Sequence, residues 1–303
     1  MDWKFERVAG PYGFAEGPVW MGDHLLFTDI PNSRIMRYDP GTGSCDEFRT
    51  GTNRANGLTR GADGTVYACE GGATSLPGGE AADALDGRRI VAYPENGDAV
   101  VLGDQWEGQR LNSPNDIVED AAGRIWFTDP RYGDREDMEL DHESVFRLDP
   151  DGSGGYTIAR VTFDTTRPNG ILVTPDMSAL YVAQSDPIPD ATRELRRYPI
   201  LEDGSVGEYE IPHNFHPHRG IDGMRFDADG NIVASAGSTQ SGPGPMIYVF
   251  TQSGRVLETH PIEVDPTNCC FGDDDLQSLY VTCADGSLFK ARTDRQGLPV
   301  GNA

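Results

Sequence analysis

The sequence predicts an all-β fold, a β-propeller of six blades, and three observations support this prediction. One pattern of segments recurs six times along the 303 residues, and a sheet unit repeated in this way closes into a ring. The segments hold four to eight residues and are rich in Val, Ile, Phe, Tyr and Trp, which favour strands. The 37 glycines and 21 prolines are spread between them as turn residues.

Each copy of the pattern has the order strand, Asp/Gly turn, strand, loop, strand. In the first copy the strand segments are Glu16–Trp20, His24–Asp29 and Ser33–Asp39. The copies begin at residues 16, 56, 115, 169, 222 and 268, so successive starts lie 40, 59, 54, 53 and 46 residues apart. A propeller blade needs roughly 40 to 50 residues, so the longer intervals hold inserted loops. We expect these inserts at about residues 71–88 and 130–143, where they would form a rim or lid.

The segment before the first copy is expected to complete the ring. Residues Trp3–Ala9 would add an outer strand to the last blade, which joins the two ends of the chain and protects a sheet edge. We therefore treat residues 1–303 as one propeller domain. An open sandwich of the same strands is the alternative fold, but a sandwich does not require a repeated unit.

The first residue of every copy carries a side-chain oxygen. The innermost strand of a blade runs along the central channel, so these residues occupy equivalent points around one ring. Carboxylate and amide oxygens suit hard divalent cations, and two carboxylates in a narrow channel repel each other without one. We predict one divalent cation, Ca²⁺ first, with Mg²⁺, Mn²⁺ or Zn²⁺ as alternatives. The ring residues are Glu16, Asn56, Asn115, Asn169, Asp222 and Asn268.

A purely structural explanation of the ring competes with the metal site. Asn and Asp favour the turn that leads into a strand, often before a glycine, as in Asn56-Gly57. Glu16 does not fit this explanation, because Glu is not a turn residue. For Asn56 and Asn268 both explanations remain open.

Composition excludes several classes of partner. The net charge of −24 repels nucleic-acid phosphates and anionic lipid headgroups. No stretch approaches the ~18 apolar residues of a membrane helix, and the N-terminus lacks the pattern of a signal peptide. We expect a soluble cytoplasmic protein whose partner is a small molecule, with no nucleic acid and no membrane. Its oligomeric state stays open.

The cysteines exclude two further classes of structure. Their number is odd and they form no C-x-x-C pair, which argues against a disulfide framework and against structural zinc. The five are Cys45, Cys69, Cys269, Cys270 and Cys283.

Four motifs together resemble the gluconolactonase/regucalcin family of six-bladed propellers, also called the senescence marker protein or SGL family. They stand in the family's order and the resemblance covers nearly the whole chain. The segment Phe127–Gly133 is similar to the bacterial gluconolactonase branch in particular. The four motifs are Phe14–Trp20, Ser113–Asp116, Arg167–Ile171 and Ile221–Met224.

The resemblance implies roles for individual residues. It implies that Glu16, Asn169 and Asp222 bind a metal ion, with Asn115 as a further ligand or a close substrate contact. It also implies that Asp222 is the general base. Regucalcin-like members have an arginine two residues before the position of Asn115, whereas this chain has Ser113 there, so the identity of the substrate is not carried over.

Taken together, these features predict a metal-dependent hydrolase that opens a sugar lactone to the aldonic acid. The cation would polarise the substrate carbonyl, and Asp222 would deprotonate the attacking water, unless the cation alone activates that water. Two alternatives remain: an organophosphorus triester hydrolase, and a non-catalytic calcium-binding propeller. Two carboxylates in the channel favour catalysis, because binding alone does not need them.

Further residues near the channel mouth are candidates for substrate binding. His213, His216 and His218 stand in a proline-broken run, which is typical either of a surface loop or of a transition-metal site. No G-x-S-x-G elbow surrounds Ser113, so we do not expect it to be a nucleophile. The substrate-binding candidates are Asn56, Glu70, Asn112, Ser113, His218, Arg219 and Asn268.

Overall fold

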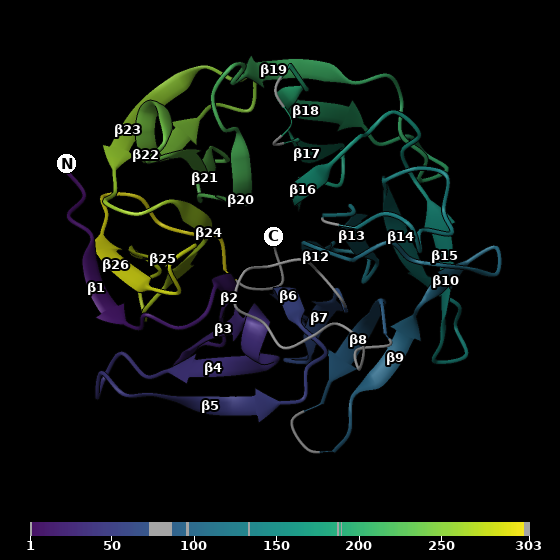
Figure 1. The fold of residues 1–303 in the computed structure, drawn as a ribbon, viewed down its shortest axis with the longest axis horizontal. Helices are drawn as coiled ribbons and strands as arrows, with labels where there is room; N and C mark the ends of the chain where they lie inside the picture. Colours follow the sequence, from purple (N-terminus) through teal and green to yellow (C-terminus); the bar gives the residue numbers. More distant parts are fainter. Residues whose placement is uncertain are drawn as a thin grey trace.

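Six four-stranded antiparallel sheets surround a central axis in the computed structural model (Figure 1). In five sheets, four consecutive strands follow one another from the axis outward, whereas the last sheet has the order β24-β25-β26-β1 and so includes the first strand of the chain. The predicted six-bladed propeller is therefore confirmed. The structure describes residues 2–72, 87–94, 97–132, 134–186, 188 and 190–299.

The innermost strand of each blade contacts the innermost strands of both neighbouring blades, so these six strands close around the axis in chain order (Figure 1). They are β2 (Ala15–Trp20), β6 (Ala55–Arg60), β12 (Ile117–Glu119), β16 (Pro168–Val173), β20 (Ile221–Phe226) and β24 (Pro266–Gly272). Five of the six predicted ring residues lie in these strands. Asn115 lies just before β12.

The middle strands of the blades carry most of the core. The second strands are β3 (Leu25–Asp29), β7 (Val66–Glu70), β13 (Ile125–Asp129), β17 (Ala179–Ser185), β21 (Ile232–Ser238) and β25 (Ser278–Cys283). The third strands are β4 (Arg34–Tyr38), β8 (Arg89–Tyr93), β14 (Ser144–Pro150), β18 (Arg193–Pro199), β22 (Ser241–Phe250) and β26 (Leu288–Arg292).

Each blade also has a fourth, outermost strand, which the sequence pattern did not delineate in the first five blades. In five blades it directly follows the third strand in the chain. These strands are β5 (Cys45–Thr50), β9 (Val100–Gly103), β15 (Tyr156–Arg160), β19 (Glu210–Asn214) and β23 (Val256–Pro261). Other short elements are the 3₁₀ helix η1 (Ile30–Asn32) and a hairpin of β10 (Gln105–Trp106) and β11 (Gln109–Arg110).

The N-terminal strand closes the ring, as predicted. Strand β1 (Glu6–Ala9) pairs antiparallel with β26, so the last blade combines both ends of the chain. Ahead of this strand, Trp3 stacks on His260 with 3.8 Å between ring centroids, and its indole nitrogen donates to Asp294 Oδ1 at 2.9 Å. The sheet edge that β26 would otherwise expose is thereby covered.

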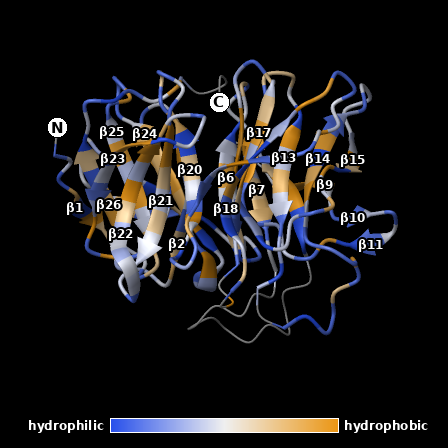
Figure 2. Cartoon of the chain, turned by 90° about the horizontal axis from the view of Figure 1, so that it is seen from above, coloured by the Kyte–Doolittle hydropathy of each residue, from blue (hydrophilic) through white to orange (hydrophobic). Residues whose placement is uncertain are grey.

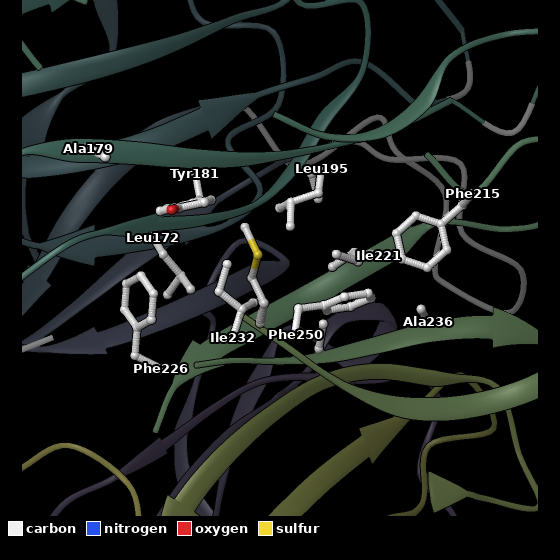
Figure 3. Close-up of a cluster of buried hydrophobic side chains, with 13 residues drawn as sticks. Leu172, Ala179, Tyr181, Leu195, Phe215, Ile221, Phe226, Ile232, Ala236 and Phe250 are labelled. Atoms are coloured by element: carbon white, nitrogen blue, oxygen red, sulfur yellow. The ribbon is translucent and has the colours of Figure 1, made fainter. Parts of the chain in front are cut away.

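Apolar side chains fill the junctions between blades. Among the described residues, six buried clusters occupy the six junctions, and Figure 3 shows one of them, where Leu172 and Tyr181 face Ile232 and Phe226 of the next blade. Successive strand residues point to opposite faces, so each strand serves two junctions. Figure 2 shows apolar residues along the strands and hydrophilic ones in the loops at both ends.

The structure also bears on the expected insert, the cysteines and the membrane segments. Of the insert expected at 71–88, residues 73–86 lie outside the described residues. All five cysteines are free thiols. Among the described residues, no helix has the length and apolar character that a membrane crossing requires. The cytoplasmic location and the single-domain assignment stay predictions.

Candidate functional site

At four of the ring residues the register of the inner strand is irregular, either across the ring residue or directly after it. Strand β2 shifts its register against β3 between Glu16 and Val19, and the inner strands of three other blades do the same. Such a bulge bends the strand and redirects a side chain. In each of these four blades a glycine follows the ring residue, which permits the bend.

The same glycines allow the blades to approach closely. A Cβ on Gly57 would lie 2.6 Å from the carbonyl oxygen of Asn115, the ring residue of the next blade, and a Cβ on Gly223 would overlap the side-chain amide of Asn268. The amide of Gly57 donates to that carbonyl of Asn115 at 2.7 Å. Four ring residues therefore lie against a glycine of the preceding blade: Asn56, Asn115, Asp222 and Asn268.

A cavity of about 140 Å³ lies where the inner strands begin, and six of the predicted residues line it. The volume is enough for an ion with a few water molecules. It adjoins a wider groove of about 500 Å³, and the two share Tyr132, Asn169 and Asp222. The predicted residues that line the cavity are Glu16, Asn56, Ser113, Asn115, Asn169 and Asp222.

Two buried carboxylates dominate the electrostatics of this cavity. Burial raises the pKa of Glu16 well above its usual value, and the nearby charges of Asp222 and Asp116 add to the shift. Burial also raises the pKa of Asp222, while Arg219 and Asn169 oppose this rise. Each carboxylate would therefore be stabilised as an anion by a positive charge in the cavity.

Arg219 and Tyr132 orient the carboxylate and amide groups of the site. The Arg219 guanidinium pairs with Asp222 Oδ2, and it is fixed in turn by donating to the carbonyl oxygens of Gly237 at 2.7 Å and Pro266 at 3.1 Å. On the other side, Asn169 Nδ2 donates to the Tyr132 hydroxyl oxygen at 2.9 Å. These contacts set the direction of both ring side chains.

Two predicted substrate contacts have structural partners instead and do not line the cavity. Glu70 is buried and accepts hydrogen bonds from Tyr93 and Arg89, both at 2.6 Å. Asn112 Nδ2 donates to the carbonyl oxygens of Asp129 at 3.2 Å and His142 at 3.0 Å. These hydrogen bonds hold the end of β7 and the segment that leads to Asn115 in place.

Three other substrate-binding candidates, Ser113, Asn268 and His218, have different surroundings. Ser113 lines the cavity, but its hydroxyl donates to the Gly71 carbonyl oxygen at 2.9 Å. Asn268 Nδ2 donates to Glu16 Oε2 at 3.2 Å, so it supports a ring carboxylate. His218 lies against Gly242, while His213 packs on Phe215.

The donor set fits a hard cation. The cavity presents oxygen ligands from carboxylates and amides, and Asn56 Oδ1 is buried there without a hydrogen-bond partner. In the described part of the chain, no three His, Cys, Asp or Glu side chains are grouped to hold a metal, so the histidine run forms no such group. An ion in this cavity would therefore need the amide oxygens, which Ca²⁺ accepts readily.

Sequence reasoning missed several residues that line the cavity, among them Phe14, Arg54 and Tyr132. A signal for two of them was present, because Phe14 and Arg54 stand two positions before a ring residue, as Ser113 does. Tyr132 had no such signal, since it comes from the insert after β13. The insert was expected at residues 130–143, but only the fold shows that Tyr132 lines the cavity.

Comparison with known families gives a match over most of the chain. The family model described as "SMP-30/Gluconolactonase/LRE-like region" matches residues 14–285. The gluconolactonase of Zymomonas mobilis is 30% identical over 322 aligned residues, which cover 96% of this chain and 82% of that protein. A pentonolactonase of Haloferax volcanii is also 30% identical, covering 89% of this chain and 81% of that protein.

A solved structure shows the same architecture. The structure of a gluconolactonase from Xanthomonas campestris superposes with a TM-score of 0.77 at 28% identity, covering 96% of this chain and 89% of that one. The likeness extends over all six blades.

Proposed function

Because the chain belongs to the SMP-30/gluconolactonase/LRE-like family, as its motifs led us to expect, we propose that it hydrolyses sugar lactones with one divalent cation bound at the ring. The observation on which this depends most is the cavity that unites two buried carboxylates, Glu16 and Asp222, with amide oxygens from neighbouring blades. The relatives named gluconolactonase and pentonolactonase support a lactone as the substrate.

The residues that would hold the cation are Glu16, Asn115, Asn169 and Asp222. When bound, the cation would offset their charge and polarise the lactone carbonyl as a Lewis acid. Ca²⁺ is the ion that this oxygen-only donor set favours.

Asp222 is the proton acceptor in this proposal. Arg219 occupies its Oδ2 atom, which leaves Oδ1 to take a proton from a water that attacks the carbonyl carbon. Burial raises the pKa of Asp222 while Arg219 opposes the rise, and a bound cation would also favour the anion, so Asp222 would be present as the carboxylate that a general base requires. The ring C–O bond then breaks, and the released alkoxide takes a proton to give the hydroxy acid.

The groove beside the cavity suits a hydroxylated substrate. It is lined by the hydroxyl and amide side chains of Ser185, Ser238, Gln240 and Ser241, which donate and accept hydrogen bonds. A sugar lactone would fill the cavity with its carbonyl end and extend its hydroxyls into this groove.

A substrate panel tests the proposal. Aldonolactones of five and six carbons and one phosphotriester are offered to the Ca²⁺-loaded protein, and acid release is followed with a pH indicator. We expect turnover of one or more lactones and none of the phosphotriester. Turnover of the phosphotriester alone would favour the triesterase alternative, and no turnover by folded protein would favour a non-catalytic calcium-binding propeller.

A further inference from the structure

We propose that Arg54 binds the substrate, as the cationic contact for the hydroxyls of the lactone and for the carboxylate of the product. This inference rests on the proposed function and adds to it a residue that determines affinity and specificity. It is built on the position of Arg54 in the repeat, the backbone that holds it, and the chemistry of the cavity that it lines.

The repeat places Arg54 at the channel mouth. It precedes Asn56 by two residues, as Ser113 precedes Asn115 and Phe14 precedes Glu16. All three of these preceding residues line the cavity. Blades two and three therefore present equivalent positions to the same space, and blade two fills its position with a guanidinium.

The backbone at Arg54 is held in an uncommon conformation. Asn53 and Arg54 both have left-handed backbone angles, with φ of 48° and 55°, which are unfavourable for residues other than glycine. The turn is fixed by four bonds: Thr52 N to Ser33 O at 3.0 Å, Arg54 N to Ser33 Oγ at 3.2 Å, Ala55 N to Thr52 O at 2.9 Å and Gly72 N to Asn53 O at 3.1 Å.

Hydrogen bonds from two blades thus keep a strained turn in place at the cavity. Strained non-glycine residues cluster at functional sites, where the surrounding structure enforces them. The long cationic side chain that follows this turn lines the cavity, and Arg54 is only 4% exposed.

The Arg54 guanidinium brings a positive charge to the lining of the cavity. Among the described residues that line the cavity, Arg54 carries the only positive charge and Glu16 and Asp222 the only negative ones. With a divalent ion bound, the cavity would hold one net positive charge, which favours a carboxylate product and a developing oxyanion. A guanidinium presents five donors in a rigid fork that matches carboxylate and hydroxyl oxygens.

Position around the ring separates Arg54 from the general base. Arg54 directly precedes β6 in the second blade, and Asp222 lies in β20 in the fifth blade. These two strands lie on opposite sides of the channel (Figure 1). A lactone between them would turn its carbonyl carbon toward Asp222 and its hydroxyl-bearing edge toward Arg54. Ser113, whose hydroxyl donates to Gly71 O, supplies no charge on that side.

The test compares Arg54→Gln and Arg54→Lys with wild type and with Arg124→Gln. Arg124 is a matched control, because it pairs with Asp120 at the opposite end of blade three. For each Ca²⁺-loaded protein we would measure kcat and KM on glucono-1,5-lactone, and the affinity for gluconate by titration calorimetry. Melting temperature and Ca²⁺ affinity show whether each variant is folded and metal-competent.

We expect Arg54→Gln to raise KM and to weaken gluconate binding by about 10- to 100-fold, the range for a lost hydrogen bond to a charged group. The lysine variant should recover part of both, and Arg124→Gln should change neither. Unchanged KM and gluconate affinity in both folded Arg54 variants would overturn the inference. If wild type binds gluconate through Arg54 but opens no lactone, the proposed function fails while the binding role stands; if wild type binds no gluconate, the inference fails.

Discussion

At the scale of the residue, the candidate site contains pairs in which a proposed oxygen ligand is followed by a glycine. Glu16-Gly17 and Asp222-Gly223 each combine a carboxylate aimed at the channel with a residue small enough for the next blade to close on it. The ligand supplies the chemistry, and the glycine supplies the packing that keeps the channel narrow. A substitution of the carboxylate should therefore lower activity, and a substitution of the glycine should lower stability.

Replacing Asp222 by Asn removes the proposed proton acceptor and one ligand charge while conserving the shape of the side chain. General-base catalysis contributes about 10²–10⁴-fold to a rate, so we expect kcat on a lactone to fall by at least 10²-fold. Rates with saturating Ca²⁺ measure this, and the melting temperature checks folding. A folded variant that keeps more than a tenth of the wild-type kcat would contradict the role of Asp222.

Replacing Gly223 by Ala tests the packing role. The added Cβ overlaps the Asn268 side chain, which donates to Glu16, so the blade junction must shift. Overpacking of this kind costs about 1–3 kcal/mol, and cation affinity should fall with it. Denaturant unfolding and Ca²⁺ titration measure the two effects. Gly41→Ala is the control, since only Asp39 lies near its added Cβ; equal stability of the two variants would speak against the packing argument.

At the scale of the element, carboxylates at the ends of the second strands hold the segments that lead into the ring. Asp129, the last residue of β13, accepts the backbone amides of Asn112 and Ser113, both at 2.7 Å. In the first blade Asp29 accepts the amide of Gly13 at 3.0 Å in the same way. Glu70 is likewise the last residue of its second strand, β7. Its carboxylate accepts hydrogen bonds from Arg89 and Tyr93 of the same blade.

Asp129 should make stability depend on pH. Burial raises the pKa of Asp129 to about 7 in the folded protein, against an ordinary value of about 3.9 when unfolded. Between these values the folded state holds more protons than the unfolded state, so the free energy of unfolding falls as pH rises from about 4 to about 7, by up to about 4 kcal/mol. Asp129→Asn should show a smaller fall over this range in urea unfolding. Parallel curves for the two proteins would refute this contribution.

The sequence predicted the inner strands and the ring, because these residues repeat in every blade and each blade imposes the same constraint. It did not delineate outer strands such as β5, since most of the residues of Cys45–Thr50 are exposed and exposed strands show no apolar alternation. It also assigned Glu70 and Asn112 to the substrate, although their partners are structural. Those partners come from other strands or distant loops, so only the fold reveals them.

At the scale of the whole molecule, closure of the ring determines whether the site exists. The proposed ligands come from four different blades, so any opening of the ring would separate them. Strand β1 closes the last blade on β26, and Trp3 anchors it in the core beside His260. The stability of this closure should therefore be linked to the integrity of the site.

Truncation of the closing strand tests this link. Burial of a tryptophan in a core is worth about 3–5 kcal/mol, so Trp3→Ala should lower the melting temperature. Removing residues 2–9 should lower it further, because the pairing of β1 with β26 is lost as well, and calorimetry with and without Ca²⁺ measures both. Melting of the truncated protein at the wild-type temperature would show that β1 is dispensable for closure.

The central claim is that ring carboxylates and a divalent cation act together on a lactone. The most direct measurement is the initial rate of lactone opening by chelator-stripped protein as Ca²⁺ is added back. We predict negligible activity without the ion and a saturating rise that ends near one Ca²⁺ per chain. Full activity in the stripped protein, unaffected by any added divalent cation, would contradict the claim.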